Sequence, residues 1–112
     1  MKIVEVKNVI SKPNPHGVDA RSISDTKNAQ VAHITLQPGQ ALKKHITPVD
    51  VFFYILEGNI TVEIGDERIM AGPDVLVESP AKIPHRLANE GNSRGRVLVV
   101  KTPRPAESTK VL

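Results

Sequence analysis

The chain has 112 residues, enough for one domain with a single core, and its 39% hydrophobic but only 3% aromatic composition favours strands built from Val, Ile and Leu. It contains no cysteine, which excludes disulfides, a thiol nucleophile and thiolate-bound zinc. The net charge is +3, but the basic residues are scattered among acids and aromatic residues are few, so we expect no nucleic-acid surface.

The first 28 residues are predicted to form an N-terminal strand and loop. Residues 1–10 are assigned to a short strand, Pro13 and Pro15 then predict a loop, and residues 18–28 suit an edge strand followed by a turn. The N-terminus lacks the continuous apolar stretch of a signal peptide, and no run reaches membrane-spanning length. A soluble, cytoplasmic protein that does not bind membranes is therefore expected.

From residue 31 onward the chain alternates as strands do. Ala32, Ile34 and Leu36 share one face of the strand 31–36, whereas His33 lies on the other, where a surface or interface histidine is expected. Further strands are predicted at residues 51–56, 60–64, 68–71, 75–77 and 97–100, the segment 75–77 as a buried strand and residues 101–112 as an extended or frayed tail.

Gly and Pro turns separate these strands, and no capped helical run interrupts them. Many short strands at intervals of about eight to twelve residues are typical of an antiparallel sandwich or barrel. The sequence therefore predicts one all-β domain over residues 1–112.

Two segments carry the most specific pattern in the chain. Residues 39–58 read GQALKKHITPVDVFFYILEG, and residues 72–89 read GPDVLVESPAKIPHRLAN. Together they resemble the two cupin motifs. The matching positions are Gly39, His45 and Gly58 in the first motif and Gly72, Pro80, His85 and Asn89 in the second. This resemblance implies an antiparallel double-stranded β-helix, which is a jelly-roll barrel and commonly a dimer.

The resemblance also implies a divalent metal held in the barrel by three histidines and a glutamate, with Mn, Fe, Ni or Zn as candidates. Only His45 and His85 match those four ligands, because Thr47 and Val51 stand at the other two positions. His16 and Asp50 are candidate replacement ligands, although strand alternation directs Asp50 outward unless Pro48 introduces a bulge. Lys82 replaces a glycine of the second motif, which we interpret as a change in the loop.

Strand alternation directs His45, Thr47, Val51 and Phe53 toward the barrel interior, and His85 is expected to meet them from the opposite side. These five residues are the predicted ligand-binding residues. Alternatively, the two histidines are merely buried and hydrogen-bonded. Basic residues beside them would favour an anionic ligand at the rim, and large apolar residues on the opposite face predict a homodimer interface. The rim residues are Lys43, Lys44, Lys82 and Arg86; the interface residues are Phe52, Tyr54 and Leu56.

Three functions agree with this pattern. The first is a module that binds a small, anionic molecule in the barrel, with or without metal. The second is a metal-dependent enzyme of the isomerase, dioxygenase or decarboxylase type, which needs a third ligand. The third is a structural or regulatory dimer. No catalytic residue is identified.

Overall fold

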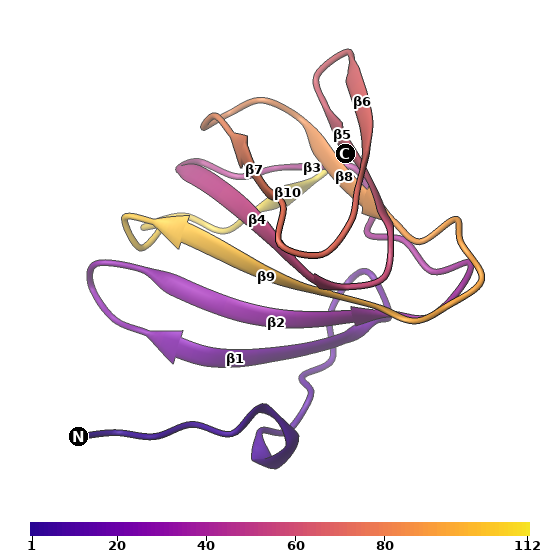
Figure 1. The fold of residues 1–112 in the computed structure, drawn as a ribbon. Coiled ribbons are helices and arrows are strands. Elements are labelled where there is room, and N and C mark those ends of the chain that lie inside the picture. Colours follow the sequence, from indigo (N-terminus) through magenta and orange to yellow (C-terminus); the bar gives the residue numbers. More distant parts are fainter.

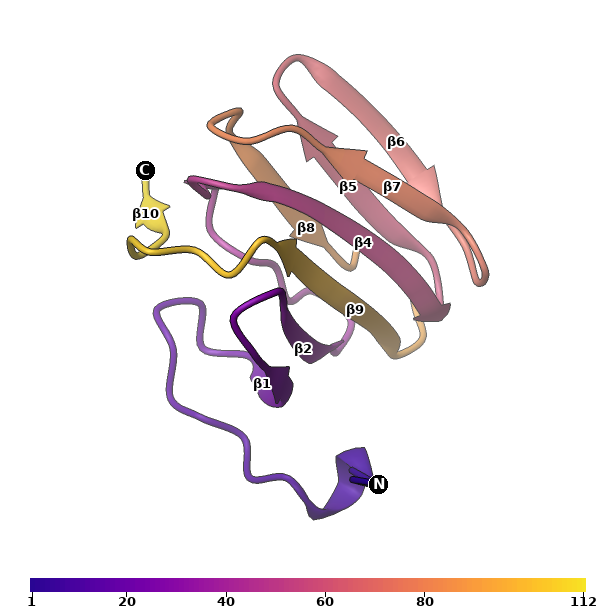
Figure 2. The ribbon, with the colours of Figure 1, turned by 90° about the vertical axis from the view of Figure 1, so that its left-hand side faces the viewer.

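The computed structural model describes residues 1–112 and consists of two five-stranded antiparallel sheets that face each other (Figures 1 and 2). The first sheet has the order β1-β2-β9-β4-β7 and the second β10-β3-β8-β5-β6. This arrangement confirms the predicted all-β double-stranded β-helix. The strands are β1 (Asp19–Asp25), β2 (Gln30–Leu36), β3 (His45–Ile46), β4 (Asp50–Glu57), β5 (Ile60–Ile64), β6 (Glu67–Ala71), β7 (Leu76–Ser79), β8 (His85–Ala88), β9 (Gly95–Thr102) and β10 (Lys110–Val111).

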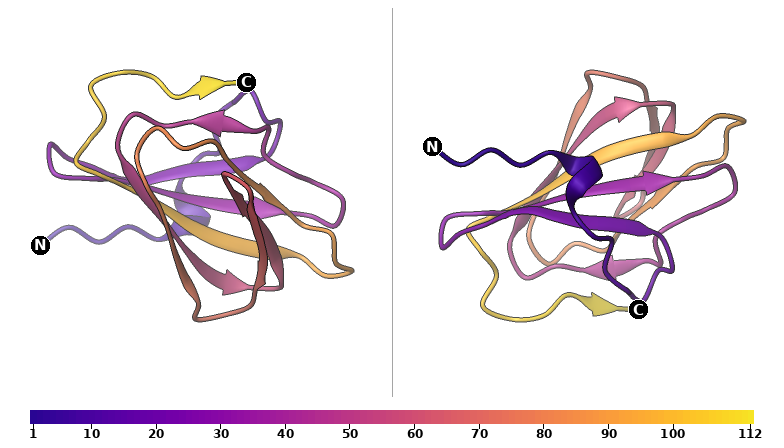
Figure 3. Two further views of the ribbon diagram at one scale, coloured as in Figure 1. Left: turned by 90° about the horizontal axis from the view of Figure 1, so that it is seen from above. Right: turned by 90° about the horizontal axis from the view of Figure 1, so that it is seen from below.

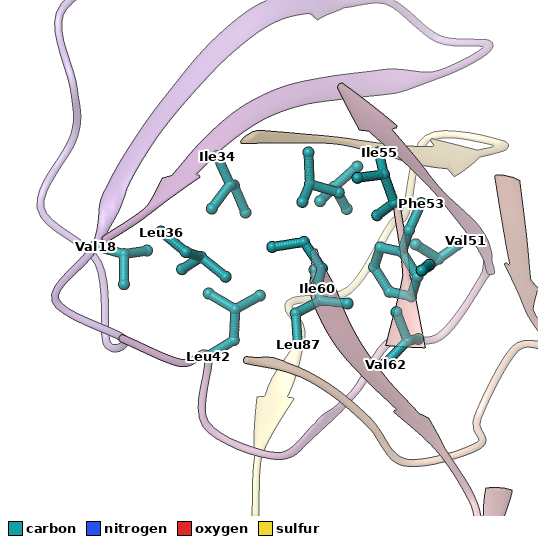
Figure 4. Close-up of a cluster of buried hydrophobic side chains, with 13 residues drawn as sticks. Val18, Ile34, Leu36, Leu42, Val51, Phe53, Ile55, Ile60, Val62 and Leu87 are labelled. Atoms are coloured by element: carbon teal, nitrogen blue, oxygen red, sulfur yellow. The ribbon is translucent and has the colours of Figure 1, made fainter. Parts of the chain in front are cut away.

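The hydrophobic core lies between the two sheets (Figure 4). Strand β4 illustrates how the sequence builds it, because Val51, Phe53 and Ile55 alternate with partly exposed residues and are each at most 3% exposed. Leu36 from β2 and Leu87 from β8 complete the contact from both sheets and are fully buried. The core extends to the histidines, because Phe53 packs against the ring of His85.

The N-terminal segment differs from its prediction. Residues 1–10 form no strand; their only regular element is a 3-10 turn, η1 (Val6–Asn8). This segment crosses the outer face of β1 and β2 (Figure 3, right), where Arg21 Nη1 donates a hydrogen bond to the Val6 carbonyl at 3.0 Å. Without a partner strand edge, its short apolar pairs remain outside the core. No helix of the chain has the length and apolar character needed to cross a membrane.

The C-terminal segment is more ordered than a frayed tail. Strand β9 continues to Thr102, and after a turn the chain returns to form β10, which pairs with β3 at the edge of the second sheet. The Leu112 N–H donates to the Lys44 carbonyl at 2.9 Å. Residues 103–112 therefore cross the open end of the barrel, where the two histidines lie; we call them the C-terminal strap.

Strand β7 is an edge strand, which corrects the expectation of a buried strand at residues 75–77. Val75 is 39% and Leu76 48% exposed, because nothing covers the outer side of this edge. Leu76 lies opposite Tyr54, and Tyr54 in turn lies opposite Leu98 of β9. These three residues form an apolar row on the outer face of the first sheet. Phe52, Tyr54 and Leu56 all lie on this face as predicted and are half-buried.

Candidate functional site

His45 and His85 meet inside the open end of the barrel. They are cross-strand partners in β3 and β8, and both side chains are buried, at 7% and 2% exposure. Their ring centroids are 4.4 Å apart and the planes stand at 77°, so the edge of one ring meets the face of the other. The ring of Phe53 packs against His85 in a similar way, at 5.3 Å. The sequence-predicted pair is therefore brought together.

Thr47 and Val51 also face inward, although not for the reason first assumed. The strand breaks between β3 and β4, at residues 47–49, so His45 and Val51 do not belong to one continuous strand. Both positions are nevertheless buried, at 1% for Thr47 and 3% for Val51. The break preserves the inward face because it spans the bend between the two sheets.

A chain of polar side chains runs through this cluster. Ser79 Oγ lies 2.7 Å from His85 Nδ1, and His85 Nε2 lies 3.4 Å from the Thr47 hydroxyl. The Thr47 hydroxyl lies 3.5 Å from the hydroxyl of Thr109 in the C-terminal strap. The Thr109 hydroxyl accepts a hydrogen bond from Lys101 Nζ at 3.1 Å. An ammonium can only donate, so Thr109 can donate to Thr47 and Thr47 to His85 Nε2. The chain is thus consistently directed from Lys101 to Ser79.

Lys101 was missed by the sequence analysis. It is the last inward position of β9, where it faces Val51 on β4 and Gln30 on β2. The alternation Val97, Val99, Lys101 could have revealed it, had the strand been extended by one residue beyond Val100. Ser79 was missed as well, because the predicted strand ended at Val77.

His16 lies beside the cluster and comes from the N-terminal loop. Its ring centroid lies 5.1 Å from that of His45, and its Nδ1 accepts a hydrogen bond from the Lys43 N–H at 2.8 Å. His45 Nδ1 lies 2.6 Å from the Lys43 carbonyl, which can only accept, so His45 carries a proton there. When its ring is neutral, His45 Nε2 therefore keeps a free lone pair.

Burial controls the electrostatics of the cluster. The pKa of His85 falls to about 4, chiefly by desolvation and further by the positive charges of His45 and Lys101. Desolvation likewise lowers the pKa of His16 and of His45, and Lys101 adds to both effects. Burial also lowers the pKa of Lys101 itself. No acidic side chain hydrogen bonds or ion-pairs with any of these four groups in the structure.

The remaining candidates lie outside the cluster. Asp50 is exposed and accepts a hydrogen bond from the Ala81 N–H at 2.8 Å, so Pro48 does not turn it inward. Lys43, Lys44 and Lys82 are exposed, and Arg86 pairs with Glu63 at 2.9 Å. The side chains of these four basic residues contact no histidine ring. The positive charge expected beside the histidines comes from Lys101 instead.

Two further positions are described here. Lys82, which stands where the second motif has a glycine, adopts φ +67°, the left-handed conformation that a glycine favours. His33 does lie on the outer face, but it is 3% exposed. Arg21 is its cross-strand neighbour, Arg96 Nη1 lies 3.2 Å from His33 Nε2, and the N-terminal segment crosses this face. These neighbours account for its burial.

Asn89, the last residue of the second motif, has a structural role. Its amide donates to the carbonyls of Leu36 and Ser93, both at 2.8 Å, and its side-chain oxygen accepts from the Gly91 N–H at 3.0 Å. The buried side chain thus ties the loop between β8 and β9 to the end of β2. It holds the barrel closed at the end remote from the histidines.

A cavity of about 470 Å³ opens beneath the C-terminal strap. It is lined by Gln30, Lys101 and residues 104–109. Lys101 therefore has the cavity on one side and, through Thr109, the histidine cluster on the other. None of the three histidines lines this cavity, so Lys101 and Thr109 are the residues that it shares with the polar chain.

The paired sheets and the inward histidines define a small double-stranded β-helix protein with a polar site at one barrel end. Residues 32–101 match the family model described as Cupin domain, and the chain belongs to this family. A search of curated proteins finds no match.

Solved structures agree with this assignment. The protein TT1209 from Thermus thermophilus is 32% identical, with a TM-score of 0.81 over 94% of this chain and 100% of its own. The polyketide cyclase RemF from Streptomyces resistomycificus is 19% identical, with a TM-score of 0.84 over 100% and 85%. A predicted oxalate decarboxylase from Thermotoga maritima is 17% identical, with a TM-score of 0.79 over 99% and 100%. The last two likenesses concern the fold alone.

Cupin domains often bind metal ions, and the side chains at the motif positions decide whether this chain can do so. Only His45 and His85 offer ring nitrogens at motif positions, and Thr47 and the hydrocarbon Val51 occupy the others. No group of three or more His, Asp or Glu side chains is arranged to hold a metal ion. A divalent ion prefers at least three donors and gains from negative charge, whereas Lys101 brings positive charge here. These residues do not fit a divalent metal.

Proposed function

We propose that this protein binds a small carboxylate at the open end of the barrel. The observation that supports it most is the convergence of Lys101, His16, His45 and His85 with no acidic side chain among them. A buried basic cluster without a counter-ion is costly, and a bound anion would relieve that cost. Lys101 would supply the charge, while the histidines would take up a proton when the anion enters.

The test is titration calorimetry with malonate and with lactate, at pH 6 and pH 8, in buffer containing EDTA. We expect binding that is tighter at pH 6, because an anion raises the depressed pKa values of the histidines and so couples binding to proton uptake. Lys101→Met should weaken binding at least about tenfold, the loss of one charge-assisted hydrogen bond. The exposed Lys44→Met serves as the matched control and should bind as the parent does.

Two results would count against this function. One is an affinity that Lys101→Met and Lys44→Met reduce equally, since that would indicate general surface charge. The other is binding that disappears in EDTA and returns on addition of Mn²⁺. That result would favour the metal-dependent enzyme over a binding module that needs no metal.

We also propose that the protein is a homodimer in which a second copy covers the outer face of the first sheet. The apolar row Leu76, Tyr54 and Leu98 supports this, and so does the arm that precedes η1, where Ile3 is 77% exposed with nothing to cover it. In a dimer with a two-fold axis, the apolar arm of each copy can pack on the apolar face of the other copy, so the contact forms twice.

Light scattering should give a dimer for the parent and a monomer for Leu76→Asp. Ile69→Asp, on the other sheet, should remain dimeric; a monomeric parent would contradict the proposal.

A further inference from the structure

Lys101 is the one lysine of the chain that faces the barrel interior. Its amine donates a hydrogen bond to Thr109 and takes part in none of the seven ion pairs of the structure. Its cross-strand partner on β4 is Val51, whose side chain is hydrocarbon, and the exposed Glu107, which lines the same cavity, makes no ion pair with the amine. A lysine held this way differs from the exposed Lys43, Lys44 and Lys82 around it.

Two features beside this amine suit carbonyl chemistry. The cavity beneath the C-terminal strap is lined by Lys101 and by Thr109, the residue that Nζ hydrogen bonds. On the other side, the hydroxyls of Thr109 and Thr47 lead to His85 Nε2 at contacts of 3.4 to 3.5 Å, which offers a path for protons away from the amine.

We propose that Lys101 is a nucleophile that forms an imine with a small oxo acid entering the cavity beneath the C-terminal strap. The carboxylate part of this substrate class rests on the proposed function above, whereas the imine itself requires only a carbonyl group. Desolvation supports the reactivity, because it lowers the pKa of Lys101 and so increases the share of neutral amine.

The chemical step balances without an oxidant or reductant. The lone pair of the neutral Nζ attacks the carbonyl carbon, a C–N bond forms, and the carbonyl electron pair moves to oxygen. Oxygen receives one amine proton through the neighbouring hydroxyls to give a carbinolamine. This hydroxyl then leaves as water with the second amine proton while the C=N bond forms. Amine and carbonyl thus give imine and water.

The experiment traps the imine by reduction. The intact protein is incubated with pyruvate and sodium cyanoborohydride, and the products are measured by intact mass and peptide mapping. We expect one adduct per chain, located on Lys101, under conditions that leave Lys43, Lys44 and Lys82 unmodified. Lys101→Arg keeps a cation that can donate to Thr109 but cannot form an imine, so its adduct should be lost while its melting temperature stays near that of the parent.

Lactate separates this proposal from the proposed function, because it has the same carbon skeleton with a hydroxyl in place of the carbonyl. Lactate that binds to the parent and to Lys101→Arg, together with no trapped pyruvate on Lys101, would overturn the imine and leave carboxylate binding standing. A trapped adduct on Lys101 without any lactate binding would support the imine and overturn the proposed carboxylate binding. Adducts spread over the exposed lysines, equal in parent and variant, would also overturn the imine.

Discussion

Lowering the pH from 7.5 to 4.5 should destabilise the folded protein by about 2 to 3 kcal/mol through His85 alone. The ring has a pKa near 4 in the folded state against 6.5 in the unfolded chain, because burial beside His45, Thr47 and Phe53 disfavours the charged form. Between these two values the unfolded chain binds more protons. The contribution is therefore fully present above pH 6.5 and is lost as the pH falls toward 4.

Urea unfolding at the two pH values measures this effect, with His85→Gln as the variant that cannot titrate. The variant should lose less unfolding free energy than the parent between the two pH values, and the difference should be about 2 to 3 kcal/mol. Glu57 does not obscure the comparison, because Arg94 and Arg96 hold its pKa at about 2, so its contribution changes mainly between pH 4.5 and 2. A His85 ring titration midpoint near 6.5 by NMR, or equal losses in parent and variant, would refute the prediction.

Much of this site could be predicted because it depends on alternation within strands. His45, Thr47, Val51 and Phe53 were placed on the inward face from their spacing, and all four are buried. The sheet pleat explains Val51 and Phe53 within β4, whereas Thr47 lies in the break between β3 and β4, where strand alternation does not apply.

Other features depend on contacts between distant segments, which no local pattern records. His33 was placed on the correct face, but its burial depends on the N-terminal segment and on Arg96, which is 63 residues away. Strand β10 has only two residues and exists because it pairs with the edge strand β3. The left-handed backbone of Lys82 carries no compositional signal, since lysine rarely adopts it. The inward position of Lys101 follows from alternation along β9, but its hydrogen bond to Thr109 depends on the C-terminal strap.

Gly58→Ala should destabilise the fold by about 3 kcal/mol, more than any other glycine substitution we consider. Gly58 ends β4 with φ +78°, and a Cβ there would lie 2.6 Å from the Arg94 carbonyl oxygen and 2.9 Å from Gly95 Cα. Both contacts are backbone atoms of the loop between β8 and β9 and its entry into β9, so no flexible side chain can move aside. The loss therefore combines left-handed strain, about 1 kcal/mol, with a backbone clash of about 2 kcal/mol.

Gly39→Ala is the matched control, because Gly39 has a similar φ of +87° but no atom within 4 Å of the added Cβ. Both substitutions restrict the unfolded chain equally and impose the same strain, so Gly39→Ala should cost only about 1 kcal/mol. The difference between the two, measured by urea unfolding at pH 7.5, reports the close approach of the β4–β5 turn to the start of β9. Equal losses would mean that this approach tolerates a methyl group, and that left-handed strain alone explains a glycine at the end of the first motif.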